Sequence, residues 1–282
     1  MAATGELHAP QTLYRHWEHE QWNPWSIDLT SDRDQWQNAL TDDDKGLVYW
    51  ALSSLMVAEE RITTKFAGLV MAAESEEEAS YLASQQVDEA RHMQFYARFQ
   101  NEVIAEPATI AAHVARSREQ LGDSFTVIFD RALVGAHERL AASPADPYAK
   151  VDFVTIYHLI IESTLGLTAF EFITRYLTDN ELLPGFVDGY SHIHHDEQRH
   201  IGYGVWYLRE AARRDSSLAA QIRAKLLELL PAVASALAPP DRGDTDWEAL
   251  GASGDEIRAF ALSGLTRRLS IIGVSLGDGS GG

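Results

Sequence analysis

Apolar residues recur at helical spacing along most of this chain. After Thr41 they alternate in steps of four and three, which places them on one face of a long helix. The acidic run TDDD at its start supplies a cap and puts negative charge in the first turn, where the helix dipole favours it. The apolar positions of this face are Val48, Leu52, Leu55, Ile62, Phe66 and Leu69.

Further segments show the same helical periodicity, and we find no substantial run with the period of two that marks strands. Segment 151–177 is so strongly apolar that we expect it at the centre, covered on several sides. The pattern predicts an all-α fold, with a core of four long helices and additional helices around it. The helices expected after the first cover 76–103, 118–142, 151–177, 186–213, 218–237 and 255–269.

The chain divides into three parts by composition. Residues 1–40 are rich in aromatic and polar groups, and we expect them to form an irregular arm that packs on the bundle. Residues 41–270 form the predicted helical domain, and the glycine-rich stretch 271–282 is expected to be a disordered tail.

Charged residues interrupt the apolar faces in an ordered way. Glu59 falls on the face of the first helix, and Glu162 lies in the apolar stretch YHLIIESTLG. A lone carboxylate on a core face is costly unless it is paired or binds a metal. Accidental alignment of surface charges could explain 76–78, but it does not explain Glu162.

Two Glu-x-x-His pairs complete this set. Glu89 and His92 project from one helix face, as do Glu197 and His200, because residues three apart lie on the same side of a helix. Two helices with Glu alone and two with Glu-x-x-His are the donor pattern of di-iron and di-manganese carboxylate bundles. Four carboxylates balance two divalent ions, and the set leaves positions open for dioxygen. The chain has no H-E-x-x-H motif, so a metalloprotease is excluded, and zinc hydrolysis is the remaining alternative.

Composition restricts the partners and the location. The formal net charge of −19 repels phosphate backbones, so no nucleic-acid partner is expected. The chain has no cysteine, which excludes disulfides and thiolate metal sites. No apolar run approaches the roughly 20 residues of a membrane span, and MAATGELHAPQ lacks a signal-peptide core. We therefore expect a cytoplasmic protein without a membrane span.

Several motifs occur in the order found in one family of the ferritin-like superfamily. The chain resembles the ribonucleotide reductase small subunit and, more closely, the related ligand-binding oxidases. The resemblance covers about residues 22–208. It is carried by WNPWSIDLTSDRDQW, AEERI, DEARH, IYHLIIESTLGLTAFEF, LLPG and HDEQRHIGYG.

This resemblance implies a set of roles at the site. Asp196 corresponds to an aspartate that binds the histidine of the other pair, here His92, and Trp22 occupies the position of a tryptophan behind them. Helix-surface charge for Asp196 and simple packing for Trp22 are the alternatives. The metal ligands implied are Glu59, Glu89, His92, Glu162, Glu197 and His200.

Two tyrosines distinguish two functions within the family. Tyr96 matches the position of the reductase radical, whereas Tyr157 matches the tyrosine that the oxidases cross-link to an aliphatic carbon, here in Ile62. Residues five apart differ by roughly 140° on an ideal α-helix, so spacing alone does not place Tyr157 beside Glu162. Either tyrosine could instead serve in core packing or hydrogen bonding.

We expect an oxidase rather than a reductase subunit, because no tyrosine follows Tyr207 to relay a radical. The oxidase would use manganese and iron, or two irons, with dioxygen to oxidise a C–H bond of an apolar ligand such as a long-chain fatty acid. We also expect a homodimer. A radical-storing reductase subunit, another di-iron oxygenase and an iron-storage protein are the alternatives. Six residues could line the ligand cavity, with ordinary core packing as the alternative for most of them: Ala58, Leu165, Gly166, Ala169, Phe170 and Phe172.

Overall fold

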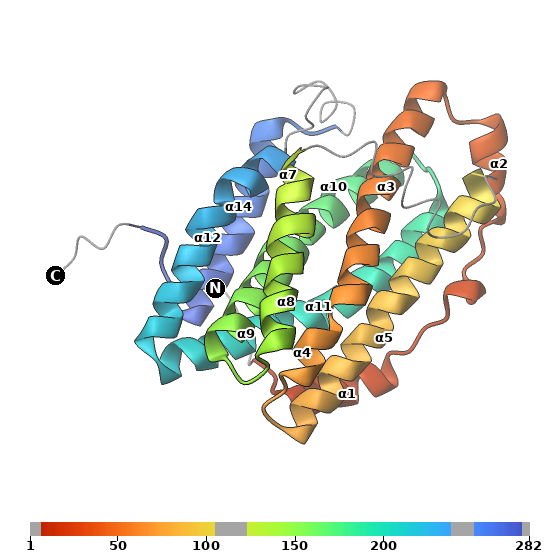
Figure 1. The fold of residues 1–282 in the computed structure, drawn as a ribbon. Helices are drawn as coiled ribbons and strands as arrows, with labels where there is room; N and C mark the ends of the chain where they lie inside the picture. The colour runs from red at the N-terminus through yellow and green to blue at the C-terminus, as the bar shows by residue number, and fades with distance from the viewer. Residues whose placement is uncertain (1–6, 105–122, 238–250, 278–282) are drawn as a thin grey trace.

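The computed structural model describes residues 7–104, 123–237 and 251–277, and its regular elements over these residues are helices (Figure 1). This confirms the all-α, ferritin-like architecture. Short 3₁₀ and π segments join some of the helices. The elements are α1 (Pro10–His19), a 3₁₀ turn (Pro24–Ser26), α2 (Thr30–Asn38), α3 (Asp42–Lys65), α4 (Ala67–Met71), α5 (Glu76–Phe99), a π segment (Gln100–Ile104), α7 (Asp123–Phe125), a π segment (Thr126–Leu133), α8 (Val134–Ala142), α9 (Pro147–Val154), a π segment (Thr155–Gly166), α10 (Leu167–Asp179), α11 (Pro184–Arg214), α12 (Ser216–Ala236) and α14 (Gly254–Ile272).

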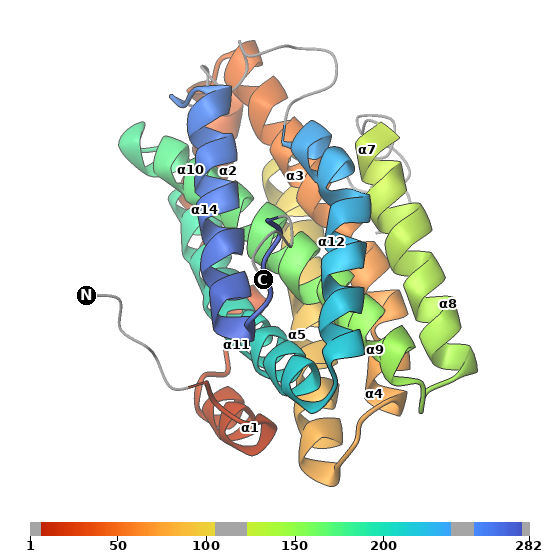
Figure 2. The same ribbon diagram turned by 90° about the vertical axis from the view of Figure 1, so that its left-hand side faces the viewer.

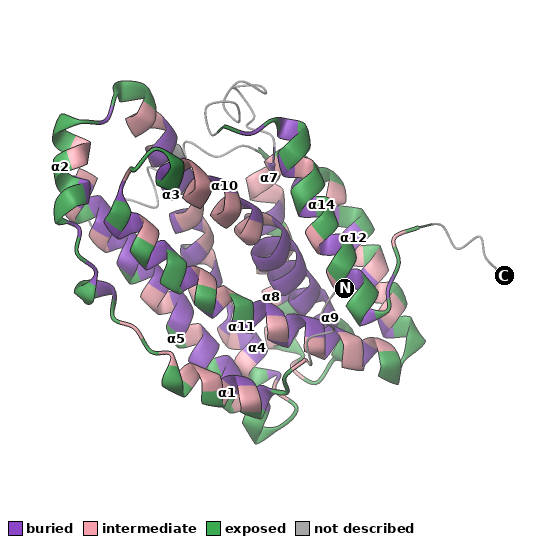
Figure 3. Ribbon diagram, turned by 180° about the vertical axis from the view of Figure 1, so that it is seen from behind, coloured by how far each residue is buried: buried purple, intermediate pink, exposed green. Residues whose placement is uncertain are grey.

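The core of the bundle is formed by α3, α5, α11 and one continuous central helix made of α9, Thr155–Gly166 and α10. Helix α3 packs on α5, and the central helix packs on α11. Helices α12 and α14 form a further layer beside α11 and the central helix (Figure 2). Buried residues follow the inner faces of the helices, and exposed residues follow the outer faces (Figure 3). Four helices that converge in this way can each contribute side chains to one interior site.

The expected start of the first long helix is confirmed. The Thr41 hydroxyl accepts from the Asp44 N–H at 3.2 Å, and the Asp44 carboxylate accepts from the Thr41 N–H at 3.0 Å. This reciprocal capping satisfies two N–H groups that have no partner within the helix. It sets where α3 begins and therefore which of its residues face the core.

The N-terminal segment differs from its expected irregular form, because α1 and α2 are regular helices. Both helices make contacts with the bundle. Helix α1 packs on α5 and buries Leu13. In α2, the buried Asp32 carboxylate accepts from the N–H groups of Gly185 and Phe186 at 2.8 and 2.7 Å. A carboxylate at a helix N-terminus is favoured by unpaired N–H groups and by the helix dipole.

Two other boundaries differ from the sequence expectations. Helix α14 continues to Ile272, and Ile272 and Val274 are buried, so the ordered chain extends past the expected boundary at 270. Residues 278–282 of the expected tail, and residues 118–122 of the expected third helix, lie outside the described residues.

One helix passes the length and apolarity test for a membrane span, contrary to the expectation that no segment does. Within the described residues this is Pro147–Asp179, the central helix of the bundle. Of its most apolar window, 72% is buried inside the protein, which is the position of a core helix. The apolar character therefore follows from being covered on several sides by other helices.

Close packing between α11 and the central helix provides a test of the fold. A Cβ atom at Gly204 would lie 2.2 Å from Cβ of His158, whereas one at Gly202 would meet only Leu13 Cδ2, at 4.0 Å. We expect Gly204→Ala to lower the free energy of unfolding by roughly 1–3 kcal/mol, because overpacking forces neighbouring groups to shift. Gly202→Ala should be neutral or stabilising by up to about 1 kcal/mol, since alanine favours helix. Denaturant unfolding of the two variants measures the difference, and equal losses would contradict this packing.

Candidate metal centre

The two Glu-x-x-His pairs face each other across the bundle. Helix α5 carries Glu89 and His92, and α11 carries Glu197 and His200. The His92 Nδ1 atom lies 3.4 Å from Glu89 Oε2 and 3.7 Å from Glu197 Oε1. The His200 Nδ1 atom lies 3.2 Å from Glu89 Oε1 and 3.8 Å from Glu197 Oε2. Each glutamate therefore presents one oxygen to each histidine.

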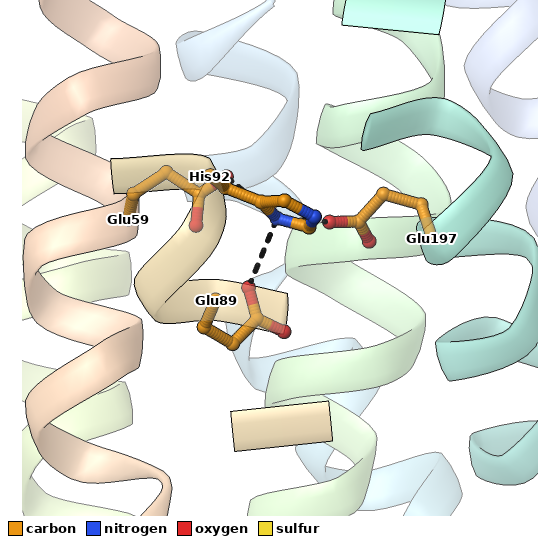
Figure 4. Close-up of side chains that lie close together, drawn as sticks. All are labelled: Glu59, Glu89, His92 and Glu197. Carbon is orange, nitrogen blue, oxygen red and sulfur yellow. Dashed lines mark ion pairs between the residues drawn. The ribbon is translucent and has the colours of Figure 1, made fainter. Parts of the chain in front are cut away.

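Glu59 and Glu162 complete the centre from the other two core helices. Glu59 Oε1 on α3 lies 3.6 Å from His92 Nδ1, and Figure 4 shows Glu59, Glu89 and Glu197 around this imidazole. Glu162 Oε1, in the π segment of the central helix, lies 3.3 Å from His200 Nδ1. One group of four is thus Glu59, Glu89, His92 and Glu197, and the other is Glu89, Glu162, Glu197 and His200. Within each group the potential ligand atoms lie within 4.8 Å of one another.

Several of these side chains bury polar atoms without hydrogen-bond partners. Buried polar atoms in proteins are normally paired, so a cluster of unpaired acceptors on one centre indicates a bound cation. Carboxylate and imidazole donors suit iron and manganese. The unpaired atoms are Oε2 of Glu59, Glu89, Glu162 and Glu197, and Nδ1 of His92 and His200. The donor set therefore fits two metal ions, and Glu89 and Glu197 belong to both groups of four.

Aspartates orient both imidazoles. The His92 Nε2 atom lies 3.1 Å from Asp196 Oδ2, and the His200 Nε2 atom lies 3.2 Å from Asp88 Oδ2. A carboxylate can only accept a hydrogen bond, so each Nε2–H donates to its aspartate. The Nδ1 lone pair of each imidazole then faces the centre. Both aspartates are fully buried.

The electrostatics of the site show the same need for positive charge. Burial raises the pKa of Glu59 to about 8 and raises that of Glu162 well above its usual value. Burial acts to lower the pKa of His92 and His200, but the surrounding carboxylates outweigh it and raise both. The raised pKa values mean that these four side chains bind protons readily, and metal binding must displace those protons.

A π-helical segment brings Tyr157 to the metal ligands. The Tyr157 hydroxyl donates a short hydrogen bond to Glu89 Oε1. The Gln85 amide lies 3.4 Å from the Tyr157 hydroxyl and 3.3 Å from Glu162 Oε1, so both residues face the same centre. Their spacing of five does not align on an α-helix, but it does in a π-helix, whose hydrogen bonds join residues i and i+5. Burial raises the pKa of Tyr157 well above its usual value, so the phenol keeps its proton.

An apolar cavity of about 170 Å³ adjoins the centre, and Glu59, Glu162 and Glu197 form part of its wall. Tyr96 and Ile62 also line it, and Tyr96 packs against aromatic rings of the core. The expected lining residues found there are Ala58, Leu165, Gly166, Ala169 and Phe170.

Phe172 is not among the lining residues, so the alternative of ordinary core packing holds for it. It is buried against the edge of Phe260 from α14, with ring centroids 5.6 Å apart. Residues 170 and 172 lie on different sides of α10, where residues two apart point in different directions. Phe172 belongs to the apolar motif in the sequence, but its side chain does not face the cavity.

The sequence analysis did not identify Asp88, Gln85 or Trp17 as parts of the site. Asp88 had a signal, because DEARH and DEQRH match at four of five positions and each aspartate precedes a ligand glutamate. The Trp17 indole donates to Asp88 Oδ1 at 2.9 Å. Trp17 lies in α1, and this segment was expected to be irregular. Gln85 had no comparable signal in the sequence, because its contact with Glu162 depends on the π segment that carries Glu162.

The fold and this donor set define a ferritin-like protein with a dinuclear carboxylate centre. The sequence model of the family "ribonucleotide reductase, small chain" matches residues 6–232. The chain therefore belongs to the ribonucleotide reductase small-chain family, as its motifs indicated.

Solved structures confirm the fold. A variant of an R2-like ligand-binding oxidase with an aerobically reconstituted Mn/Fe cofactor superposes with a TM-score of 0.81, at 22% identity, over 98% of this chain and 97% of the other. A second such variant gives a TM-score of 0.83, at 23% identity, over 98% of this chain and 100% of the other.

Removal of one carboxylate tests the assignment of the centre. We expect Glu162→Gln to retain fewer than two metals per chain, with affinity reduced by more than the roughly 10–100-fold that loss of an outer hydrogen-bond partner costs. Glu171→Gln, in α10 on the same continuous helix, lies outside both ligand groups and should retain two. Metal analysis after gel filtration measures the stoichiometry. Two tightly bound metals in Glu162→Gln would show that this ligand is wrongly assigned.

Proposed function

We propose that this protein is a dioxygen-activating oxidase, which holds manganese and iron, or two irons, and oxidises a C–H bond of an apolar ligand. The principal support is the position of the metal-ligand candidates relative to the cavity and to Tyr157. Three metal-ligand candidates open onto an apolar cavity, and a protonated tyrosine is hydrogen-bonded to a fourth. The solved structures of the same fold that carry a Mn/Fe cofactor are themselves ligand-binding oxidases, which agrees with this choice.

The proposed roles follow from these contacts. Glu59, Glu89, His92, Glu162, Glu197 and His200 would hold the metals. When bound, the metals would supply electrons to dioxygen and the oxidising power for a C–H bond. Asp88 and Asp196 hold the imidazoles in the tautomer that leaves Nδ1 free. The apolar wall excludes water and holds the ligand beside the reacting atoms.

We further propose that Tyr157 forms an ether cross-link to the tertiary carbon of Ile62. The O–H and C–H bonds break, an O–C bond forms, and two protons and two electrons leave the protein. Those electrons, with one from each of two metals, provide the four needed to reduce dioxygen to water. Tyr157 is already directed at the centre through Glu89, and Ile62 lines the adjoining cavity.

A second candidate is a radical-storing reductase subunit. Tyr96 favours it, because this residue is buried beside the cavity, where Glu59 and Glu197 form part of the wall. The two functions differ in which tyrosine is oxidised. The cytoplasmic location and the homodimer stay predictions from the sequence.

Tyrosine substitutions distinguish the two candidates. Protein loaded anaerobically with Mn(II) and Fe(II) and then exposed to air should retain two metals and develop a visible absorption band. Its intact mass should fall by two hydrogens, and Tyr157→Phe should abolish this loss while Tyr96→Phe leaves it. A tyrosyl signal in paramagnetic resonance that disappears in Tyr96→Phe would favour the reductase subunit. Less than one metal per chain would overturn both candidates.

The cavity provides a separate test of the apolar ligand. We expect wild-type protein to carry a long-chain fatty acid detectable by native mass spectrometry, and Ala169→Phe to lose it, because the ring fills space in the cavity. Ala142→Phe, at the exposed end of α8, is the matched control and should keep the ligand. Equal occupancy in both variants would place the ligand elsewhere.

A further inference from the structure

The pentapeptides DEARH and DEQRH form two matching halves beyond the metal ligands themselves. In each half the aspartate contacts the histidine of the other half: Asp88 with His200, and Asp196 with His92. In each half the arginine also binds its own aspartate. Arg91 donates to Asp88 Oδ1 at 2.8 Å, and Arg199 donates a short hydrogen bond to Asp196. The two halves differ in one contact, because Arg199 also donates to Asp88 Oδ2 at 3.3 Å.

A tryptophan completes each half. The Trp22 indole donates to Asp196 Oδ2 at 2.7 Å, and the Trp17 indole donates to Asp88 Oδ1 at 2.9 Å. The family resemblance accounts for Trp22 alone. The structure thus contains a second Trp–Asp–His chain, Trp17–Asp88–His200, which reaches the half of the centre that contains Glu162.

The second chain continues toward the surface. The ring of Tyr14, one turn earlier on α1, stacks on Trp17 with centroids 5.7 Å apart and an interplanar angle of 29°. The Tyr14 hydroxyl donates to Glu18 Oε1 at 2.6 Å, and Glu18 is exposed. Both rings are half-buried. Two oxidisable rings in contact, Tyr14 and Trp17, are therefore joined through the Asp88 carboxylate to the metal-ligand candidate His200.

Each of these two rings has a group that can balance its charge. The Asp88 carboxylate faces the indole N–H and would stabilise positive charge on an oxidised Trp17. The Glu18 carboxylate is hydrogen-bonded to the phenol and can take its proton as Tyr14 loses an electron. Packing of α1 on the bundle explains buried Leu13, but it does not require this Tyr14–Glu18 pair.

We propose that Tyr14, Trp17 and Asp88 form a second electron-transfer route into the metal centre, by way of His200. This inference rests on the proposed function, because dioxygen is the electron acceptor. The two metals and the Tyr157–Ile62 cross-link supply the four electrons of the first turnover, so the route supplies electrons in later turnovers or when no cross-link can form, as in Tyr157→Phe. In each transfer Trp17 gives one electron to the centre, and Tyr14 then gives one electron to Trp17 and one proton to Glu18. A one-electron reductant at the α1 surface restores Tyr14, with return of the proton. Trp17 and Tyr14 therefore carry electrons, and Asp88 positions His200 and stabilises the oxidised indole.

The route is tested by the radical that it leaves when no reductant is added. All proteins in this test carry Tyr157→Phe, so that the cross-link supplies no electrons. Protein with ring-deuterated tyrosine receives two equivalents of Fe(II), is mixed with dioxygen and is freeze-quenched for paramagnetic resonance. We expect a transient tyrosyl signal narrowed by deuteration. Tyr14→Phe should lose it, although the ring stack and the Trp17–Asp88 bond persist. Trp17→Phe should also lose it, whereas Trp25→Phe, at an exposed tryptophan of the same arm, should retain it.

Metal content and dioxygen uptake, measured on the same samples, separate the possible outcomes. Two metals and normal uptake in Tyr14→Phe, with the tyrosyl signal lost, support the route. An unchanged signal in Tyr14→Phe, or no signal in Tyr157→Phe protein that consumes dioxygen, overturns the route and leaves the proposed function standing. Wild-type protein that binds metals but consumes no dioxygen overturns the proposed function and the route with it. If Trp17→Phe loses metal, the result for Tyr14→Phe alone tests the route.

Discussion

The rest of the structure depends on a concentration of negative charge in the interior of a helical bundle. Four glutamates and two aspartates surround two imidazoles, and the charges are taken out of water. Such an interior is stable only when cations compensate it. The features around it serve this requirement, from the arginines on both aspartates to the arm that covers them. Metal binding and folding of the core are therefore linked.

The central helix shows how backbone geometry contributes to chemistry. Its π segment turns Tyr157 and Glu162 toward one side, where an α-helix would separate them. The segment also packs closely on α11, where Gly204 contacts His158. Tight packing thus supports the π segment. Among the described residues, Tyr157 is the only tyrosine whose hydroxyl hydrogen-bonds a ligand candidate of the centre.

Much of the fold and of the site could be predicted from the sequence, because both follow helical periodicity. Glutamates on an apolar face and two Glu-x-x-His pairs stand out against a 3.6-residue repeat, so the candidate ligands were found in advance. What could not be predicted depends on local departures from that repeat or on tertiary contacts. The alignment of Tyr157 needs a π segment, and α1 is a helix largely because it packs on α5. The place of Phe172 could not be decided, because composition does not reveal which side of α10 faces the cavity.

The N-terminal arm joins both halves of the centre, since Trp17 and Trp22 lie five residues apart and bind opposite aspartates. Each aspartate sets the orientation of one histidine, so a movement of this short stretch would alter both metal sites together. A partner or a covalent change at the surface of α1 could therefore act on the interior without entering it. The hydrogen bonds of the arm thus couple the protein surface to the buried aspartates of both halves.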